Sequence, residues 1–263
     1  MAKTTADLVA EAEAEADANL ELRRSWNVAP TSDVPVVLER LIGGAAVRQV
    51  HVARWGLVPG WAKDPAVGVR AFNARSETVL EKPTFRDAVA ARRCAVPVQG
   101  YYEWKPGPGK TKRPFYVRRA DGRLTFFAGL YEWWRDPAKA PGEAGSWLLS
   151  TSILTMASPG TDDEGGGGGG GAGPADPVLR QLAALHDRMP VPLSRAAMAA
   201  WLDPAAPDAA GLVREVTAQA LQTARRWELA EVGPRVGNVR NDGPELLAGP
   251  EPDRAAGPEP ALF

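Results

Sequence analysis

Glu103 is the residue of this chain whose surroundings most favour acid–base chemistry. It lies in the stretch Arg92–Lys105, RRCAVPVQGYYEWK, with aromatic residues on both sides. A carboxylate among aromatic rings experiences a low dielectric, which raises its pKa towards the range useful for proton transfer. Glu103 is therefore the first catalytic candidate. The alternative is a strand-end glutamate paired with a nearby arginine, and the sequence leaves both interpretations open.

Two other polar clusters contain residues suited to chemistry. His186 lies in LHDRMPV (185–191), where polar groups stand between apolar neighbours, and the ordinary pKa of an imidazole suits proton transfer near neutrality. The run Asn73-Ala74-Arg75 follows an apolar pair and indicates a site more than a core. His51, in contrast, falls in an alternating strand pattern, where a lone histidine is typical of a core or a surface.

Charge and aromatic residues indicate a possible nucleic-acid partner. Formal net charge is −1, but between Arg70 and Arg119 there are 12 Lys or Arg residues against 4 Asp or Glu, an excess of 8. A basic middle can present a cationic face to a phosphate backbone, although a solvated face balanced by the acidic ends is the commoner explanation. The loop Trp55–Asp64 carries two tryptophans among glycine and proline, which is typical of either a packed lid or a base-stacking platform.

The elements that must position these residues are mostly short strands. Alternating or apolar runs predict strands at 34–38, 47–54, 94–98, 114–118, 124–129 and 147–156, and a closing strand at 225–232. The spacing of Leu8, Ala12, Ala16 and Leu20 predicts an amphipathic helix over 4–22, begun by a capping box at Thr4 and Asp7. Helices are also expected over 194–202 and 208–221. The sequence LYEWW (130–134) is expected to form an aromatic corner. This pattern predicts an α+β fold: one β-rich domain with a few peripheral helices.

Composition sets the boundaries and the class. We expect the domain to span residues 1–248, with a flexible glycine-rich insertion at 161–176 and a disordered acidic, Pro-rich tail at 249–263. The single cysteine, Cys94, excludes an internal disulfide framework. No apolar run reaches membrane-spanning length and no secretory pattern opens the chain, so a soluble cytoplasmic protein is expected. Two distant histidines and one cysteine do not predict a metal site, and no cofactor is expected.

Six segments, taken together, resemble one family in composition and in order. They are WNVAPT (26–31), WGLVPGWAKD (55–64), FNARSETVLEKPTFR (72–86), RRCAVPVQGYYEWK (92–105), FAGLYEWW (127–134) and LHDRMPVPL (185–193). In these motifs the chain resembles the SOS response-associated peptidase family, also described as abasic-site processing or crosslinking proteins. The resemblance covers about residues 26–241.

The resemblance implies a β-rich domain whose positively charged groove holds single-stranded DNA. Family members react with the ring-opened aldehyde of an abasic site through a cysteine made N-terminal by removal of their own initiator methionine. Its amine and thiol close a thiazolidine crosslink. By the same resemblance, Asn73 would orient the N-terminal residue, Glu103 would assist sugar opening and Schiff-base formation, and His186 would shuttle protons. The residues expected to contact DNA are Arg75, Arg86, Arg188, Trp104 and Trp61.

The family pattern fails at the start of the chain. Members begin Met-Cys-Gly-Arg, whereas this chain begins Met1-Ala2-Lys3-Thr4, so the first family residues, including the nucleophile, are expected to be missing. Cys94 is not expected to substitute, because burial raises the pKa of a thiol and leaves it inert. A cysteine-less paralogue that binds single-stranded DNA non-covalently is the alternative. A peptidase or amide hydrolase is a further alternative, although no Ser/His/Asp order or zinc motif supports it.

Overall fold

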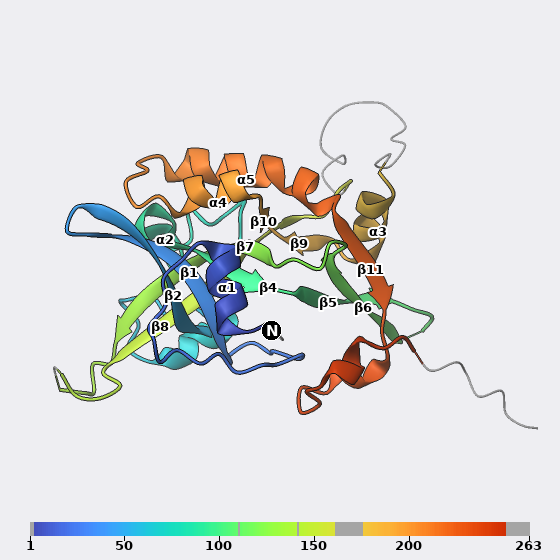
Figure 1. The fold of residues 1–263 in the computed structure, drawn as a ribbon, viewed down its shortest axis with the longest axis horizontal. Coiled ribbons are helices and arrows are strands. Elements are labelled where there is room, and N and C mark those ends of the chain that lie inside the picture. Colours follow the sequence, from blue (N-terminus) through green and yellow to red (C-terminus); the bar gives the residue numbers. More distant parts are fainter. Residues whose placement is uncertain (1–2, 110, 141, 161–175, 251–263) are drawn as a thin grey trace, which may run out of the picture.

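The structure is a computed structural model of the 263-residue chain, and it describes residues 3–109, 111–140, 142–160 and 176–250. Figure 1 shows a large β-sheet structure with few helices, which confirms the predicted β-rich α+β domain. Most of the glycine-rich insertion (161–175) and most of the predicted tail (251–263) lie outside the described residues. The expected domain boundary at residue 248 stays a prediction.

Five strands close into a barrel. They are β1 (Asp33–Ile42), β2 (Ala45–Trp55), β4 (Arg93–Val98), β7 (Thr125–Arg135) and β8 (Trp147–Ala157). The pairing order is β7-β4-β1-β2-β8, and β8 pairs back onto β7, which removes the free edges. All pairs in this ring are antiparallel except β2 with β8. Three short strands extend the sheet: β3 (Asn73–Arg75), β9 (Arg188–Pro190) and β10 (Pro192–Leu193).

Side chains along the barrel strands point alternately into and out of the barrel, and both faces are buried. The interior face is built from Val36, Leu38, Cys94, Val96, Phe127 and Ile153, with neighbours. The outer face contributes residues of the opposite parity, among them Val37, Ala95 and Ala128, to a second core beneath the helices. Because both faces of β4 are covered, its first five residues are all buried.

A second, three-stranded sheet flanks the barrel. It consists of β5 (Gly100–Pro106), β6 (Lys112–Arg119) and β11 (Trp227–Glu231), in the order β11-β6-β5. Edge-to-face packing joins it to the barrel, since the Tyr101 ring centroid lies 5.8 Å from those of Phe127 and Trp227. In Figure 1 this sheet lies beside the barrel, below α3.

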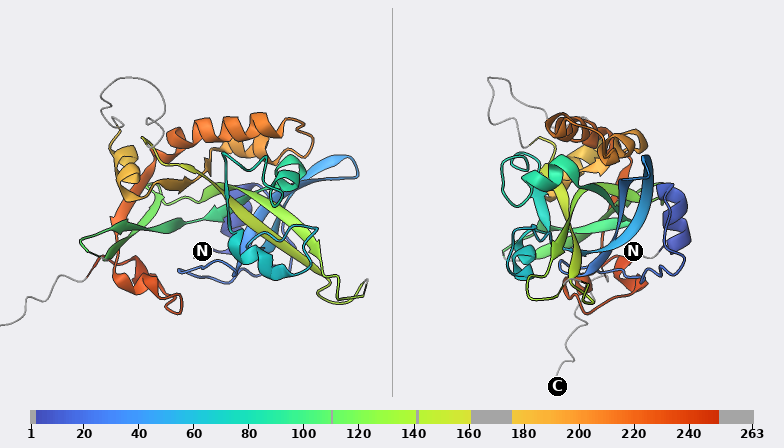
Figure 2. Two further views of the ribbon diagram at one scale, coloured as in Figure 1. Left: turned by 180° about the vertical axis from the view of Figure 1, so that it is seen from behind. Right: turned by 90° about the vertical axis from the view of Figure 1, so that its left-hand side faces the viewer.

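The helices pack around these sheets (Figures 1 and 2). They are α1 (Thr5–Ala12), α2 (Arg86–Ala91), α3 (Pro177–Leu185), α4 (Arg195–Leu202) and α5 (Ala209–Ala224), with 3-10 helices at Pro65–Arg70, Pro234–Gly237 and Pro244–Leu247. The predicted helices at 194–202 and 208–221 are therefore confirmed within three residues. The fully buried Trp201 anchors α4, because its indole N–H donates to the carbonyls of Cys94 and Gly129 at 3.0 and 3.2 Å.

Two local predictions were wrong. The expected helix over 4–22 starts with the predicted capping box at Thr4 but ends at Ala12, because Glu13 adopts a left-handed conformation (φ 52°). From there Glu15 pairs its backbone with β2, donating to the Arg48 carbonyl and accepting from the Val50 amide, both at 2.8 Å. The supposed aromatic corner 130–134 is the continuation of β7, whose register with β8 runs unbroken from Gly129 to Arg135.

Arg93 has a structural role in the basic stretch. The residue is 3% exposed. Its guanidinium donates to the carbonyls of Val89 and Ala90 in the last turns of α2, and to those of Trp201 and Asp203 at the end of α4. Arg93 thus satisfies carbonyls that two helix ends would otherwise leave without partners.

Candidate functional site

Two motifs distant in sequence meet on the C-terminal half of β8. Strand β3 pairs with it in parallel, setting Asn73 opposite Ile153 and Arg75 opposite Thr155. Strand β9 pairs with it in antiparallel orientation, setting Pro190 opposite the same Thr155. Ala74 is buried, whereas Asn73 and Arg75 on either side of it are exposed. The NAR cluster and the segment that follows His186 therefore flank β8 on its two edges at the same level.

Arg188 binds protein groups in this structure. Its guanidinium forms a two-bond ion pair with Glu77 at 2.9 and 3.0 Å and donates to the Thr155 carbonyl at 2.9 Å. Burial alone would raise the pKa of Glu77, but the hydrogen bonds and the charge of Arg188 outweigh it, and the pKa is lowered. Glu77 and Thr155 were missed in the sequence, since nothing local links Glu77 to a partner 111 residues away. A DNA contact by Arg188 stays a prediction.

His186 follows the last residue of α3 and is exposed. Its Nδ1 accepts a hydrogen bond from the Arg188 amide at 3.0 Å, and the same atom lies 2.9 Å from Oδ1 of Asp187. The amide suits the neutral ring with its proton on Nε2, whereas the carboxylate suits the protonated ring. Both contacts involve Nδ1, and no contact of Nε2 with the described residues is seen.

Glu103 lies in the middle of β5 and is half-buried. It projects to the same face as Tyr101, which packs on Phe127 at the barrel end. Its Oε1 accepts from the Trp104 amide at 3.0 Å. None of the described residues forms an ion pair with Glu103, which stands in mid-strand, so the alternative of an arginine-paired strand end does not hold; a catalytic role stays a prediction.

Asn73, Glu103 and His186 come from neighbouring elements. Helix α3, which ends next to His186, packs against β5, which carries Glu103. Strand β3, which carries Asn73, adjoins β8, and β8 adjoins the segment after His186. Within the described residues, no hydrogen bond joins the three side chains to one another.

The remaining predicted DNA-contact residues lie in different environments. Trp61 is 60% exposed, and its indole N–H reaches the Pro83 carbonyl at 3.4 Å. Arg86 opens α2 and is exposed, with Asp87 3.5 Å away. Trp104 is half-buried and projects to the face of β5 opposite Glu103, next to the segment whose Trp26 carbonyl accepts from Tyr102 at 2.9 Å. Trp61 is thus the more accessible of the two tryptophans.

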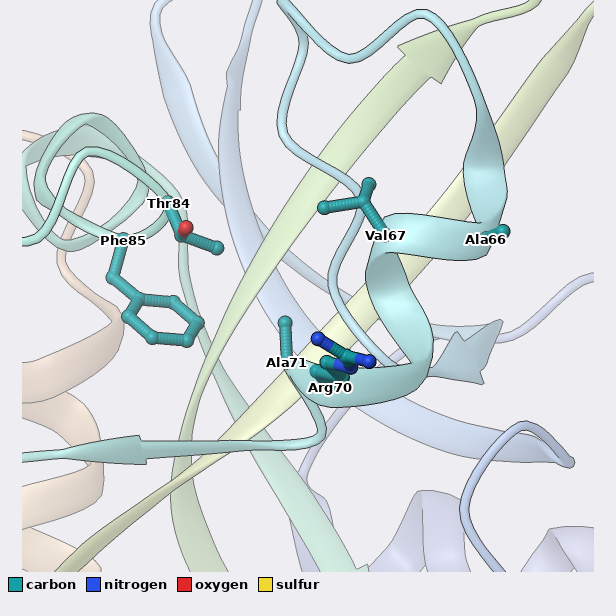
Figure 3. Close-up of a pocket in the computed structure, with 6 residues that line it drawn as sticks. All are labelled: Ala66, Val67, Arg70, Ala71, Thr84 and Phe85. Atoms are coloured by element: carbon teal, nitrogen blue, oxygen red, sulfur yellow. The ribbon is translucent and has the colours of Figure 1, made fainter.

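A cavity of about 430 Å³ opens between the residues that link two motif segments and the end of the second segment, 72–86. Figure 3 shows that the 3-10 helix Pro65–Arg70 lines the cavity on one side, and that the two residues directly before α2 line it on the other. The lining residues are Ala66, Val67, Arg70, Ala71, Thr84 and Phe85. Arg70 and Phe85 combine a cation with an aromatic ring, a pairing that suits a phosphate next to a base. Sequence reasoning missed both residues, although each adjoins a predicted contact residue or motif.

Cys94 does not have the properties of a nucleophile. The side chain is fully buried inside the barrel, and its sulfur lies 3.4 Å from the Thr151 hydroxyl. Burial raises the pKa of the thiol to about 12, which leaves almost no thiolate near neutrality. The expectation that this cysteine is inert thus agrees with its surroundings.

The part of the chain that the structure describes offers neither a cluster of metal ligands nor a membrane-spanning helix. Among those residues, no group of three or more His, Cys, Asp or Glu side chains is arranged to hold a metal ion. No helix in those ranges combines the length and apolar character needed to cross a bilayer.

Comparison with known proteins assigns the fold and the motifs to a family. A family model for SOS response associated peptidase (SRAP) matches residues 1–239. Abasic site processing protein YoqW of Bacillus subtilis (strain 168) is 32% identical over 229 residues, covering 86% of this chain and 87% of the relative. Abasic site processing protein HMCES of Mus musculus is 30% identical over 261 residues, covering 85% of this chain and 64% of the relative.

Solved structures share the architecture. A protein from Bacteroides thetaiotaomicron matches with a TM-score of 0.69 at 20% identity, covering 95% of this chain and 97% of that one. A protein from Bordetella bronchiseptica matches with a TM-score of 0.61 at 25% identity, covering 88% and 96%. Because the family model spans nearly the whole chain and the relatives match it over most of their length, the chain belongs to the SOS response associated peptidase family.

Proposed function

We propose that this chain binds single-stranded DNA and processes abasic sites in it. The relatives named abasic site processing proteins support the substrate. The observation that carries the proposal is the convergence of Asn73, Arg75 and the His186 segment along one half of β8. An exposed arginine on one edge of β8 and a histidine preceding the strand on its other edge suit a phosphate contact in the same region as a proton-transfer step.

The proton transfers are assigned to two groups. An abasic sugar must open to its aldehyde before an amine can attack it, and opening requires a proton to leave the C1′ hydroxyl while another reaches the ring oxygen. We assign these transfers to His186 and Glu103, a base and an acid in different environments. Glu103 is half-buried next to Tyr101, whereas His186 is exposed. Asn73 is assigned to orient the attacking residue.

The covalent step needs an N-terminal cysteine. Its amine condenses with the C1′ aldehyde to an imine and releases one water. The thiol sulfur then adds to the imine carbon while its proton passes to the nitrogen, which closes the thiazolidine. The 263-residue sequence contains one cysteine, the buried Cys94. We therefore assign non-covalent binding to the chain as printed, and crosslinking to a form that opens with Cys-Gly-Arg.

Fluorescence anisotropy with a labelled oligonucleotide tests the binding. Single-stranded DNA carrying a stable abasic analogue should bind with an affinity that falls steeply as salt rises, because phosphate contacts release counterions. Arg75→Ala should weaken binding to all sequences alike, by roughly 3- to 10-fold, and flatten the salt dependence. The matched control is Arg135→Ala, an exposed arginine at the opposite end of the barrel, which should leave binding unchanged. Affinity that is independent of salt, or a preference for duplex alone, would contradict the proposal.

A further inference from the structure

A layer of polar side chains lies at one end of the barrel interior. Val36 and Leu38 point inward, and their register partners across β2 are His51 and Gln49. Arg40 follows Leu38 by two residues and so shares the inward face. On β7, Tyr131 is 6% exposed and belongs to the same interior core. Beyond the apolar middle of the barrel, the interior therefore turns polar.

This layer lies at the end of the barrel remote from the candidate site. Asn73 adjoins residue 153 of β8, whereas Leu149, near the start of β8, pairs with Trp133 near the end of β7. His51 lies edge-on to Trp133, with ring centroids 6.5 Å apart. Trp133 is 37% exposed, so the layer opens to solvent at its rim. The two ends of the barrel thus present two separate polar regions.

Three buried nitrogen atoms of this layer lack a partner among the described residues. They are Nε of Arg40, Nε2 of His51 and Nε of Arg92, which immediately precedes β4. Other atoms of the arginines are bonded: Arg40 Nη2 donates to Gln49 Oε1 and Arg92 Nη2 to Glu132 Oε2, both at 2.8 Å. The side chains are therefore held in place while donors remain unused. Buried polar atoms without partners are costly, so a ligand that accepts from the two arginine Nε–H groups would bind favourably.

The charges of the layer favour an anion. Of the two guanidiniums, Arg92 is paired with the Glu132 carboxylate, whereas Arg40 bonds to the neutral amide of Gln49, so its charge has no counter-charge among these contacts. Burial lowers the pKa of His51, and the Arg40 charge lowers it further, so the ring is neutral and does not add to the charge. Burial raises the pKa of Tyr131, whereas the charges of Arg40 and Arg92 lower it, so both cations lie within electrostatic range of this hydroxyl. One excess positive charge remains in a region of low dielectric.

We propose that this end of the barrel is a second ligand site that binds a phosphate group through Arg40, Arg92 and His51. The phosphate is either inorganic phosphate or the phosphate of a nucleotide. For a nucleotide, the exposed Trp133 ring supplies a face on which the base stacks. Charge-assisted bonds from two arginines and one imidazole match the acceptor oxygens of a phosphate.

Histidine NMR tests this site, because the chain contains two histidines, one at each end of the barrel. Millimolar inorganic phosphate should shift the His51 ring signals saturably and raise the pKa of that ring, since a nearby anion favours the charged imidazole. The variant His51→Gln assigns the signals. Arg40→Gln should weaken the response about tenfold or more, as loss of a charge-assisted bond does. Arg54→Gln, on the outward face of β2, is the matched control and should leave the response intact.

A second arm separates the two phosphate sources. Thymidine monophosphate should bind more tightly than inorganic phosphate, and Trp133→Leu should remove that difference while leaving the inorganic phosphate response unchanged. Equal binding of the two ligands would identify the site as one for free phosphate. The proposal is overturned if the His51 signals do not move with either ligand in the folded wild-type protein, or if they move equally in Arg40→Gln. The His186 signals report separately on the candidate DNA site.

Discussion

At the scale of single residues, Glu103 is the side chain whose role is easiest to isolate. Replacement by glutamine keeps its size and its bond from the Trp104 amide but removes the carboxyl group. In a form opening with Cys-Gly-Arg, Glu103→Gln should slow crosslinking to abasic DNA by roughly 10²-fold or more, as loss of a general acid does. Single-turnover rates on labelled oligonucleotides measure this.

The control for that substitution is Glu228→Gln, an exposed glutamate on β11 of the same small sheet. It should change neither the rate nor the DNA affinity. An unchanged rate in Glu103→Gln itself, with folding intact, would remove Glu103 from the chemistry.

Glu77 gives a pH dependence whose sign follows from its lowered pKa. A carboxyl with a lowered folded pKa stabilises the fold fully above its unfolded pKa, about 4.3, and loses that contribution as pH falls through the folded value. Glu77→Gln should therefore reduce the unfolding free energy at pH 7 by about 0.5 kcal/mol, as expected for a partly exposed pair. Urea unfolding should show the difference shrinking towards pH 3.

Glu81→Gln, an exposed neighbour on the same segment, is the control and should show no such pH-dependent difference. If Glu77→Gln lowers stability equally at pH 7 and pH 3, the ion pair with Arg188 does not stabilise the fold.

At the scale of elements, the start of β5 depends on a glycine. A Cβ on Gly100 would lie 2.5 Å from both the Tyr116 ring and the Val117 carbonyl oxygen of β6. Gly100→Ala should therefore push β5 away from β6, cost about 1–3 kcal/mol of stability as overpacking does, and displace Glu103. The midpoint temperature of thermal unfolding and the crosslinking rate should both fall. Gly237→Ala, with open space around its Cβ, should be tolerated, and equal behaviour of the two variants would contradict this packing.

Two helix ends depend on one arginine. Arg93→Met keeps the length of the side chain but leaves four carbonyls of α2 and α4 without their donor. The cost should be roughly 3 kcal/mol or more, because four carbonyls, two of them in fully buried bonds, would lose a charged donor. Arg118→Met, which removes an exposed arginine from the neighbouring sheet, should cost far less. Chemical denaturation compares the two variants, and similar denaturant concentrations at the unfolding midpoint would contradict the role assigned to Arg93.

At the scale of the whole molecule, local patterns predicted the five barrel strands together with β6 and β11, but they missed β5, which carries Glu103, and the assembly of the strands. The alternation at 47–54 identifies β2, yet the parallel pairing of Arg54 with Ser150 that helps to close the barrel joins residues nearly a hundred positions apart. The prediction of a helix over 4–22 was wrong beyond Ala12, because backbone pairing of Glu15 with β2 outweighed the helical spacing of the apolar residues.

The candidate site was predictable to a similar degree. The surroundings of Glu103 are local in sequence, and its neighbours Tyr101 and Trp104 were readable there. The ion pair of Arg188 could not be predicted in this way, because its partner Glu77 lies on a segment distant in sequence. The polar end of the barrel was equally hidden, since Arg40 and His51 read separately as ordinary strand residues.

The most direct test of abasic-site processing is a denaturing gel with a labelled abasic single strand. A form opening with Cys-Gly-Arg should give a protein–DNA band that survives heating, because its first residue offers both an amine and a thiol. The chain as printed, whose single cysteine is buried with a pKa of about 12, should bind the DNA but give no such band. A heat-stable band from the printed chain that Cys94→Ala abolishes, or none from the Cys-Gly-Arg form, would contradict the account.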